Sequence, residues 1–178
     1  MAIKKFVIVG PESTGKSTLC QNLSAHFKTD WVREYAREYL EVNGTKYTFE
    51  NLYDIALGQL SGEDAAVKHF QEANKNIPLI IDTNLYVTKV WSEFVFNKCD
   101  TRVLTEITKR KYDGYLLCNT DVNWIKDNLR EYPDLETREK LFHYYKEELS
   151  EQKTPWIIIS GCYEERTKQA IDFVNGLL

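Results

Sequence analysis

The segment from Gly10 to Thr18, with the sequence GPESTGKST, constrains the fold of this chain more than any other feature. It fits the pattern G-x-x-x-x-G-K-[ST], and it follows a short apolar run that ends at Val9. Glycines let such a loop wrap around an anion, while its N–H groups and the N-terminus of the next helix point at the charge. The segment therefore predicts a phosphate-binding loop (P-loop) between a strand and a helix.

Individual side chains of this loop have expected roles. The Lys16 ammonium can reach the β- and γ-phosphates of a nucleotide, and the Ser17 hydroxyl can ligate Mg²⁺. The alternative is a glycine-rich turn that binds nothing, and the flanking strand and helix make it the weaker one. We therefore expect ATP and Mg²⁺ as cofactors. The loop residues expected on the nucleotide are Gly10, Glu12, Ser13, Thr14, Gly15, Lys16, Ser17 and Thr18.

Short apolar runs alternate with longer amphipathic segments along the rest of the chain. This alternation is typical of an α/β fold in which helices flank a mostly parallel sheet. Five strands are expected at 3–9, 31–32, 78–82, 115–118 and 156–159. Helices are expected at 16–27, 34–42, 49–74, 84–97, 101–111, 135–149 and 164–174. The length of 178 residues suits a single P-loop domain, 1–178, with a short lid at about 120–138.

Composition and charge exclude several classes of function. Lys and Arg number 23 and Asp and Glu 27, so the net charge is −4, without the basic bias of a nucleic-acid-binding protein. No apolar run approaches the roughly 20 residues that span a bilayer. The four cysteines have no metal-binding spacing and are expected to be buried, reduced thiols. We expect a cytoplasmic protein with a small-molecule substrate and no nucleic-acid or membrane partner; the oligomeric state is open.

An acidic residue ends the most apolar of the later strands. Asp82 and Thr83 follow Leu79-Ile80-Ile81, and the carboxyl ends of parallel strands face the ligand crevice in open α/β sheets. A carboxylate at this place can hold Mg²⁺ or orient an acceptor hydroxyl. The alternative is that Asp82 or Thr83 caps the next helix. We favour the catalytic interpretation because of the position at the strand end.

A charged segment follows the expected second strand. Residues 33–39 read REYAREY, and this strand end would face the phosphate acceptor. Glu34 could take a proton from an acceptor hydroxyl, and Arg37 could hold a phosphate or a sugar. The alternative is a solvated helix face. The pairs at four-residue spacing are like-charged and do not stabilise a helix, which favours a role in binding.

Arginines and an aromatic residue in later loops are further candidates. Arg130 and Arg138 could close over a triphosphate from the lid. An ordinary charged surface helix explains them equally well. Tyr163 follows the last strand, where it could lie against an adenine ring or serve only in packing.

Five segments, taken in order, carry a family resemblance. GPESTGKST, REYARE, IIDT, WIKDNLR and SGCYEER resemble the ribosylnicotinamide kinase domain of the NadR family, a small AAA-like P-loop kinase. The resemblance covers nearly the whole chain. It implies a fold like the nucleoside monophosphate kinases. It also implies transfer of the ATP γ-phosphate to the 5′-hydroxyl of nicotinamide riboside, a step of NAD biosynthesis.

The resemblance also implies roles for single residues. Glu34, Tyr35 and Arg37 would lie near the riboside, and Asp82 and Thr83 at the catalytic centre. Asp127, Arg130 and Arg138 would belong to the lid. The catalytic set is then Lys16, Glu34, Asp82 and Arg130. The nucleotide set adds Arg130, Arg138 and Tyr163 to the P-loop. The substrate set is Glu34, Tyr35, Arg37, Asp82, Thr83 and Asp127, and the metal set is Ser17 and Asp82.

The chain departs from the family pattern at two positions. Asn84 stands where the family often has the second acid of D-T-D, and Asn128 where the lid often reads D-G-L-R. An adenylyltransferase signature H-x-G-H is missing from the sequence, so adenylyl transfer and operator binding are not expected. Two other functions stay open at this point. They are phosphorylation of another nucleoside or small metabolite, and a regulatory ATP-binding module without catalysis.

Overall fold

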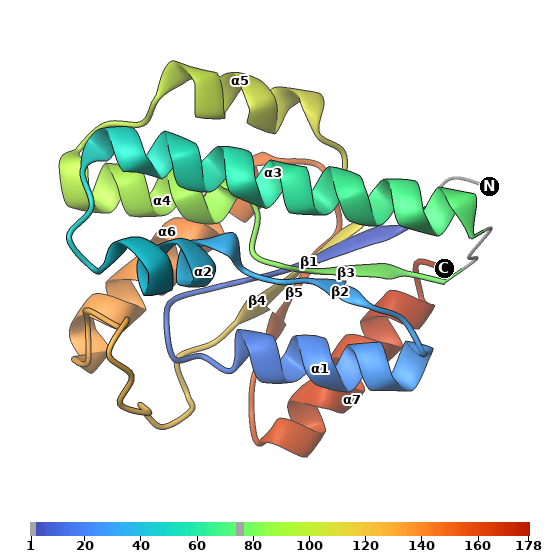
Figure 1. Cartoon of the computed structure of the whole chain (residues 1–178). Helices are drawn as coiled ribbons and strands as arrows, with labels where there is room; N and C mark the ends of the chain where they lie inside the picture. Colours follow the sequence, from blue (N-terminus) through green and yellow to red (C-terminus); the bar gives the residue numbers. More distant parts are fainter. Residues whose placement is uncertain (1–2, 74–76) are drawn as a thin grey trace.

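The computed structural model describes residues 3–73 and 77–178, and its centre is a five-stranded parallel sheet (Figure 1). The strands are β1 (Lys5–Val9), β2 (Trp31–Val32), β3 (Leu79–Asp82), β4 (Gly114–Cys118) and β5 (Trp156–Ile159). Their spatial order is β2-β3-β1-β4-β5, and every neighbouring pair is parallel. The α/β class and the five-stranded parallel sheet predicted from the sequence are confirmed.

Helices cover both faces of this sheet, which explains why its strands are apolar on both sides. They are α1 (Lys16–Phe27), α2 (Tyr35–Asn43), α3 (Phe49–Glu72), α4 (Leu85–Phe96), α5 (Thr101–Lys109), α6 (Leu135–Glu151) and α7 (Tyr163–Asn175). Figure 1 shows α1 and α7 on one face and α3, α4 and α6 on the other, with α5 outside α3 and α4.

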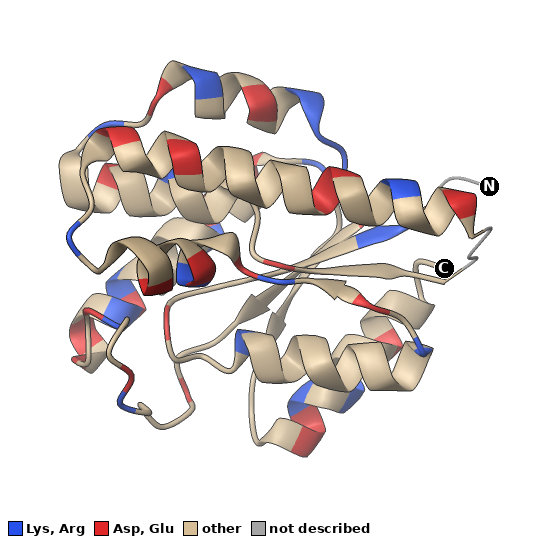
Figure 2. Cartoon of the chain, viewed as in Figure 1, with Lys and Arg blue, Asp and Glu red and all other residues tan. Residues whose placement is uncertain are grey.

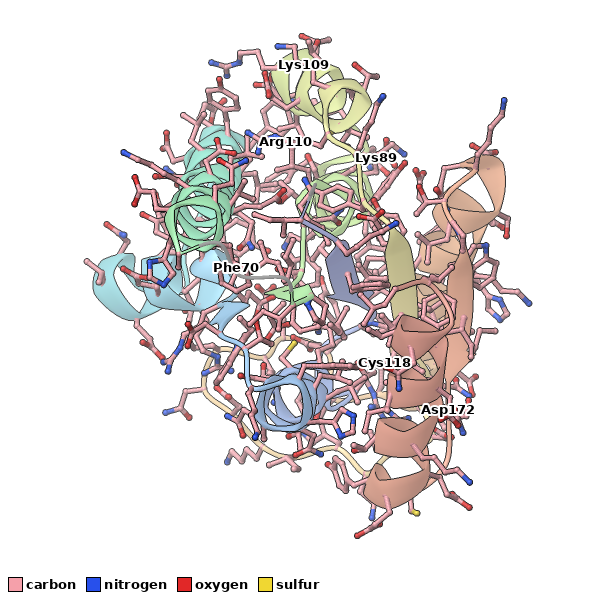
Figure 3. The ribbon with its side chains drawn as sticks, turned by 90° about the vertical axis from the view of Figure 1, so that its right-hand side faces the viewer. Phe70, Lys89, Lys109, Arg110, Cys118 and Asp172 are labelled. Carbon is pink, nitrogen blue, oxygen red and sulfur yellow. The ribbon has the colours of Figure 1, made fainter. Side chains whose placement is uncertain are left out.

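Two apolar cores lie against the sheet, one on each face, and a third apolar cluster joins α3, α4 and α5. Alternate residues of β1 serve the two cores, because side chains of a strand point to opposite faces. Val7 and Val9 pack with α3, α4 and α6, whereas Phe6 and Ile8 pack with α1 and α7. Cys118 belongs to the second core, and Figure 3 shows it inside the molecule at the end of β4.

Most element boundaries agree with the sequence within two residues. The helix expected at 34–42 begins at Tyr35, because Glu34 is its extended N-cap residue. The helix expected at 49–74 ends at Glu72, and Asn74 lies outside the described residues. Between 119 and 134 the chain forms neither helix nor strand, and Asp134 caps α6 by accepting from the Thr137 N–H.

Charged residues of both signs occur along α5 and α6, whereas those of α3 are mostly acidic (Figure 2). All four cysteines are free thiols; Cys20 and Cys118 are buried, but Cys162 is exposed, so the expectation of buried thiols is wrong for that residue. Within the described residues, none of the helices has the length and apolar character needed to cross a membrane.

Candidate functional site

The P-loop leaves β1 and passes close to β4 before it enters α1. Gly10 has a φ of 139°, and a Cβ at this residue would lie 2.8 Å from the carbonyl oxygen of Cys118. Only glycine fits both the backbone angle and the space. Within the loop, the Pro11 carbonyl accepts from the Thr14 hydroxyl (2.7 Å) and from the Lys16 ammonium (2.9 Å). The loop thus forms the curve that the motif predicts, with the N-terminus of α1 at its end.

The P-loop meets the acidic end of β3 through one short hydrogen bond. The Ser17 hydroxyl donates to Asp82 Oδ2 at 2.6 Å. Asp82 is 2% exposed, and its second oxygen, Oδ1, has no hydrogen-bond partner among the described residues. The strand-end position proposed from the sequence therefore brings this carboxylate directly beneath the P-loop.

Burial makes the Asp82 carboxylate costly to ionise. It raises the pKa of Asp82 from an ordinary value of 3.8 to about 6, and the nearby Glu34 carboxylate acts in the same direction. The Lys16 ammonium and the Ser17 hydroxyl lower the pKa of Asp82 again, but by less. Because carboxylates with perturbed pKa values cluster at functional sites, Asp82 is a candidate residue of such a site.

A pH-dependent stability difference should follow from this group. Because the folded-state pKa of Asp82 lies above its unfolded value, the carboxyl stabilises the fold fully below pH 4, and this contribution is lost as the pH rises through 6. Asp82→Asn has no such titration. We expect the free energy of unfolding of the variant minus that of the parent to increase by about 2 kcal/mol between pH 4 and pH 7. Urea unfolding without nucleotide measures it; a difference independent of pH contradicts the assignment.

The second expected acid, Glu34, lies in the same cavity as the P-loop. Glu34 precedes α2 as its N-cap residue, yet its carboxylate makes no capping bond. It lines the cavity in front of the P-loop together with Arg37. The Arg37 guanidinium donates to Asp127 Oδ2 at 2.6 Å. Hydrogen bonds from the Leu129 N–H and from Arg37 lower the pKa of Asp127, so this pair joins α2 to the lid segment.

The lid segment is held to the P-loop by two loop side chains. The Ser13 hydroxyl accepts from the Ile125 N–H (3.0 Å) and from Arg130 Nη1 (2.9 Å). Glu12 accepts from the backbone N–H groups of Glu131 and Tyr132. Burial raises the pKa of Glu12, and these two backbone bonds oppose that rise. Arg130 is consequently the lid arginine that lies beside the phosphate loop.

Arg138 has a different environment from the one expected for a lid residue. It lies in the first turn of α6, is 4% exposed and does not line the main cavity. Its guanidinium carbon is 5.6 Å from the centre of the Trp124 ring, and that of Arg130 is 5.7 Å from the same ring. Arg138 Nε and Nη1 have no hydrogen-bond partner within the described part of the chain.

One cavity joins most of the predicted residues. From the sequence-based set it is lined by Gly10, Glu12, Ser13, Thr14, Gly15, Lys16, Ser17, Thr18, Glu34, Arg37, Thr83 and Arg130. Apolar residues of α3 and α4 also line it, namely Leu52, Ile55, Val87 and Trp91. The Trp91 indole N–H donates to the Tyr47 hydroxyl at 2.6 Å. The cavity wall thus has a polar part at the P-loop and an aromatic part at Trp91 and Tyr47.

The remaining predicted residues lie around this cavity rather than on its wall. Tyr35 packs on α3, and Asp127 is paired with Arg37. Tyr163 begins α7, half exposed, with its ring beside Gly15. Asn84, which replaces the second acid of the family pattern, points away from the P-loop. It caps α4 by accepting from the Tyr86 N–H and donates to the Tyr115 hydroxyl at 3.2 Å.

Two residues of the site were missed by the sequence analysis. The buried Gln59 of α3 lines the cavity and bonds the backbone of two other segments, at Tyr35 and at Thr83. Arg166 of α7, 3% exposed, donates to the carbonyl oxygens of Thr14, Asn119 and Gly161. It also pairs with Asp121, which accepts from the Gly161 N–H (2.7 Å). Arg166 thus joins the P-loop to the loops after β4 and β5.

These features together define a P-loop nucleotide-binding domain: a parallel sheet, a P-loop between β1 and α1, and a strand-end acid bonded to the P-loop serine. A family model described as AAA domain (AAA_28) matches residues 5–166. The chain belongs to this family. The match includes the P-loop, both acids and the lid segment.

Curated relatives extend the likeness beyond the family. The chain is 27% identical over 181 residues to the "Trifunctional NAD biosynthesis/regulator protein NadR" of Salmonella typhimurium. It has the same identity to the protein of that name from Escherichia coli K12. Each match covers 99% of this chain and 43% of the relative. The chain therefore spans less than half the length of the curated relatives that it matches.

Solved structures show the same fold. A crystal structure of NadR protein in complex with NR superposes with a TM-score of 0.82 at 22% identity, covering 99% of this chain and 50% of that one. A NadR structure in complex with NAD and AMP-PNP gives a TM-score of 0.77, also at 22% identity, covering 99% and 49%. These likenesses show that the chain shares the fold of the matching part of the NadR structures.

Proposed function

We propose that this chain transfers the γ-phosphoryl group of ATP to the 5′-hydroxyl of nicotinamide riboside, giving ADP and nicotinamide mononucleotide. The observation that carries the proposal is the single cavity that is lined by the P-loop, by Glu34 and Arg37 and by an aromatic part at Trp91. A phosphoryl donor and a nucleoside acceptor thus share one enclosed space. The names of the NadR relatives, and the NR bound in one of their structures, support this acceptor.

The P-loop side of the cavity suits the triphosphate. Its backbone N–H groups and the N-terminus of α1 attract anionic oxygens, and the Lys16 ammonium lies on the same wall. Arg130, bonded to Ser13, adds a second cation next to the loop. Catalysis by these groups is positioning and stabilisation of transferring charge, since phosphoryl transfer needs little covalent chemistry from the protein.

Ser17 of the P-loop and Asp82, which it contacts, also fit a magnesium ion. The Ser17 hydroxyl and the Asp82 carboxylate are oxygen ligands of the kind that Mg²⁺ prefers, and Asp82 Oδ1 is buried without a partner among the described residues. Ser17 and Asp82 would hold the ion. When bound, Mg²⁺ supplies neutralisation of charge on the phosphate oxygens.

Glu34 is the proposed general base. In the transfer, the riboside 5′-oxygen forms a bond to the γ-phosphorus, and the bond from that phosphorus to the β,γ-bridging oxygen breaks. The hydroxyl proton goes to a carboxylate. Glu34 lines the cavity and makes no capping bond, whereas Asp82 lies beneath Ser17 and is engaged with it. Glu34 is therefore the acid with access to the acceptor.

The aromatic part of the cavity wall suits a flat, positively charged ring. The nicotinamide ring of the riboside is a pyridinium cation, and aromatic faces attract cations. Trp91 and Tyr47, joined by their hydrogen bond, offer such faces in the same cavity. The four free thiols of the chain suit the reducing conditions of the cytoplasm, where we place the reaction.

The decisive measurement is ADP release by the purified chain with Mg-ATP, with and without nicotinamide riboside. We expect release that depends on the riboside, together with a product of the mass of nicotinamide mononucleotide. Adenosine and uridine are the matched acceptors, because their ribose carries the same 5′-hydroxyl but is joined to a neutral base. ATP binding with equal release in the presence and absence of every acceptor would leave a regulatory module as the better function. Faster release with a neutral nucleoside would assign another acceptor.

A further inference from the structure

Gln59 joins the two acid-bearing segments of the site through a single side chain. Its amide oxygen accepts from the Tyr35 N–H at 2.8 Å. Its amide nitrogen donates to the carbonyl oxygens of Thr83 (3.1 Å) and Asp82 (3.4 Å). The side chain is 4% exposed and comes from the middle of α3, which contributes none of the sequence motifs of the site. The amide oxygen therefore bonds α2, while the amide nitrogen bonds the turn after β3.

Next to Glu34, Gln59 bonds the first N–H group of α2. The first N–H groups of a helix have no partner within the helix and are usually satisfied by the N-cap side chain or by water. In α2 the first such group, the Tyr35 N–H, is bonded by Gln59, and Glu34 makes no capping bond. Gln59 therefore fixes the backbone directly after Glu34, whose carboxylate makes no capping bond and lines the cavity.

On the other side, Gln59 holds a backbone turn that is unfavourable in itself. Thr83 has a φ of 66°, a left-handed conformation that is a genuine outlier for a β-branched residue and requires support from its surroundings. The Thr83 N–H donates to the Ile8 carbonyl (3.0 Å), and its own carbonyl accepts from Gln59. The turn directs Asp82 toward Ser17 while the chain continues into α4.

The neighbouring Gly58 allows this contact by letting α2 come close to α3. A Cβ at residue 58 would lie 2.0–2.4 Å from ring atoms of Tyr35. The Tyr35 ring thus occupies the space that any side chain at 58 would take. A side chain at residue 58 would have to displace this ring, which belongs to the residue whose N–H donates to Gln59.

We propose that Gln59 is a positioning residue whose amide fixes the Glu34 segment against the Asp82–Thr83 turn and so sets the spacing of the two carboxylates for phosphoryl transfer. The proposal rests on the proposed kinase function. Displacement of catalytic groups by about 1 Å can cost a factor of 10² in rate. Because Gln59 bonds neither the P-loop nor Lys16, its loss should change turnover more than nucleotide affinity.

The test compares Gln59→Met with two controls on the same helix. Gln71→Met makes the same exchange at an exposed residue, and Leu60→Val removes a methylene from the core next to the site. For Gln59→Met we expect kcat per Mg-ATP-binding site, counted by calorimetry, to fall about 10- to 100-fold, with the Kd of Mg-ATP within about threefold of the parent. Both controls should keep kcat per site. A kcat for Gln59→Met within twofold of the parent overturns the proposal.

A double variant separates positioning from general destabilisation. If Gly58→Ala acts by displacing Tyr35 from Gln59, the combined Gly58→Ala/Gln59→Met protein should have the kcat of the slower single variant. A kcat equal to the product of the two separate losses would show independent effects and contradict the shared contact.

Hydrogen exchange of backbone amides tests the positioning role of Gln59 separately from the proposed kinase function. If the parent protein does not phosphorylate the riboside, the proposed function fails, and Gln59 is judged by hydrogen exchange alone. The positioning role then requires faster exchange at the Tyr35 N–H in Gln59→Met, with β1 amides unchanged. Unchanged exchange at Tyr35 overturns it.

Discussion

Lys16→Met should abolish riboside-dependent ADP release while the protein stays folded. The Lys16 ammonium lies on the cavity wall and donates to the Pro11 carbonyl of its own loop. No other lysine lines this cavity within the described residues. Loss of one well-placed donor to a transferring group typically costs about 10²–10³ in rate, and loss of the P-loop cation should reach at least that. The measurement is kcat/KM for Mg-ATP at saturating riboside.

Folding must be checked separately for this variant. Lys16 is half-buried and belongs to neither core, so the thermal midpoint of the variant should change little. Lys168→Met, at an exposed residue of α7, is the matched control and should keep full activity. A folded Lys16→Met protein with the turnover of the parent would falsify the phosphate-binding role of the loop.

Asp82→Asn should be the second most damaging change. The amide can still accept from the Ser17 hydroxyl, so the local hydrogen bond survives, but the negative charge next to the P-loop is lost. We expect riboside-dependent turnover to fall about 10²-fold or more, because the charge that balances Mg²⁺ and orients the site has gone. The Mg²⁺ concentration that gives half-maximal activity should rise, which a magnesium titration at fixed ATP measures.

Asn84→Asp is the matched control, since it makes the reverse exchange two residues away. Residue 84 caps α4 and contacts the Tyr115 hydroxyl rather than the P-loop, and aspartate caps helices as well as asparagine does. Turnover should therefore stay within a few-fold of the parent. Equal losses in Asp82→Asn and Asn84→Asp would mean that the turn after β3 matters only for stability. A large gain in Asn84→Asp would mean that the family's second acid does act at this site.

The meeting of Ser17 and Asp82 could be predicted because it follows from chain geometry. A P-loop after the first strand and an acid at the end of another parallel strand share one edge of the sheet. The apolar runs were also sufficient to predict the five strands, since strands covered on both faces need no polar positions. These features depend on the sequence near each residue and on a general rule of topology.

Gln59 and Arg166 could not be assigned in the same way because their partners are backbone groups far away in the sequence. Each nevertheless lies at a sequence position that indicates burial. Gln59 interrupts the buried stripe of α3 between Ile55 and Glu63, and Arg166 lies one turn before the buried Ala170 of α7. A polar residue on the apolar side of a helix indicates a buried partner, without naming it. The left-handed turn at Thr83 left no such signal, since a β-branched residue argues against it.

The contacts of Arg166 bear on the entropy of nucleotide binding. The guanidinium connects three loops that are distant in the sequence, so residues near Thr14, Asn119 and Gly161 lose their conformational freedom when the chain folds. Freedom lost at that stage is not lost again when a ligand arrives, which favours tight association. The segment from Trp124 to Tyr132 has neither helix nor strand and is held to the P-loop by the side chains of Glu12 and Ser13, so the ordering that accompanies binding should fall there.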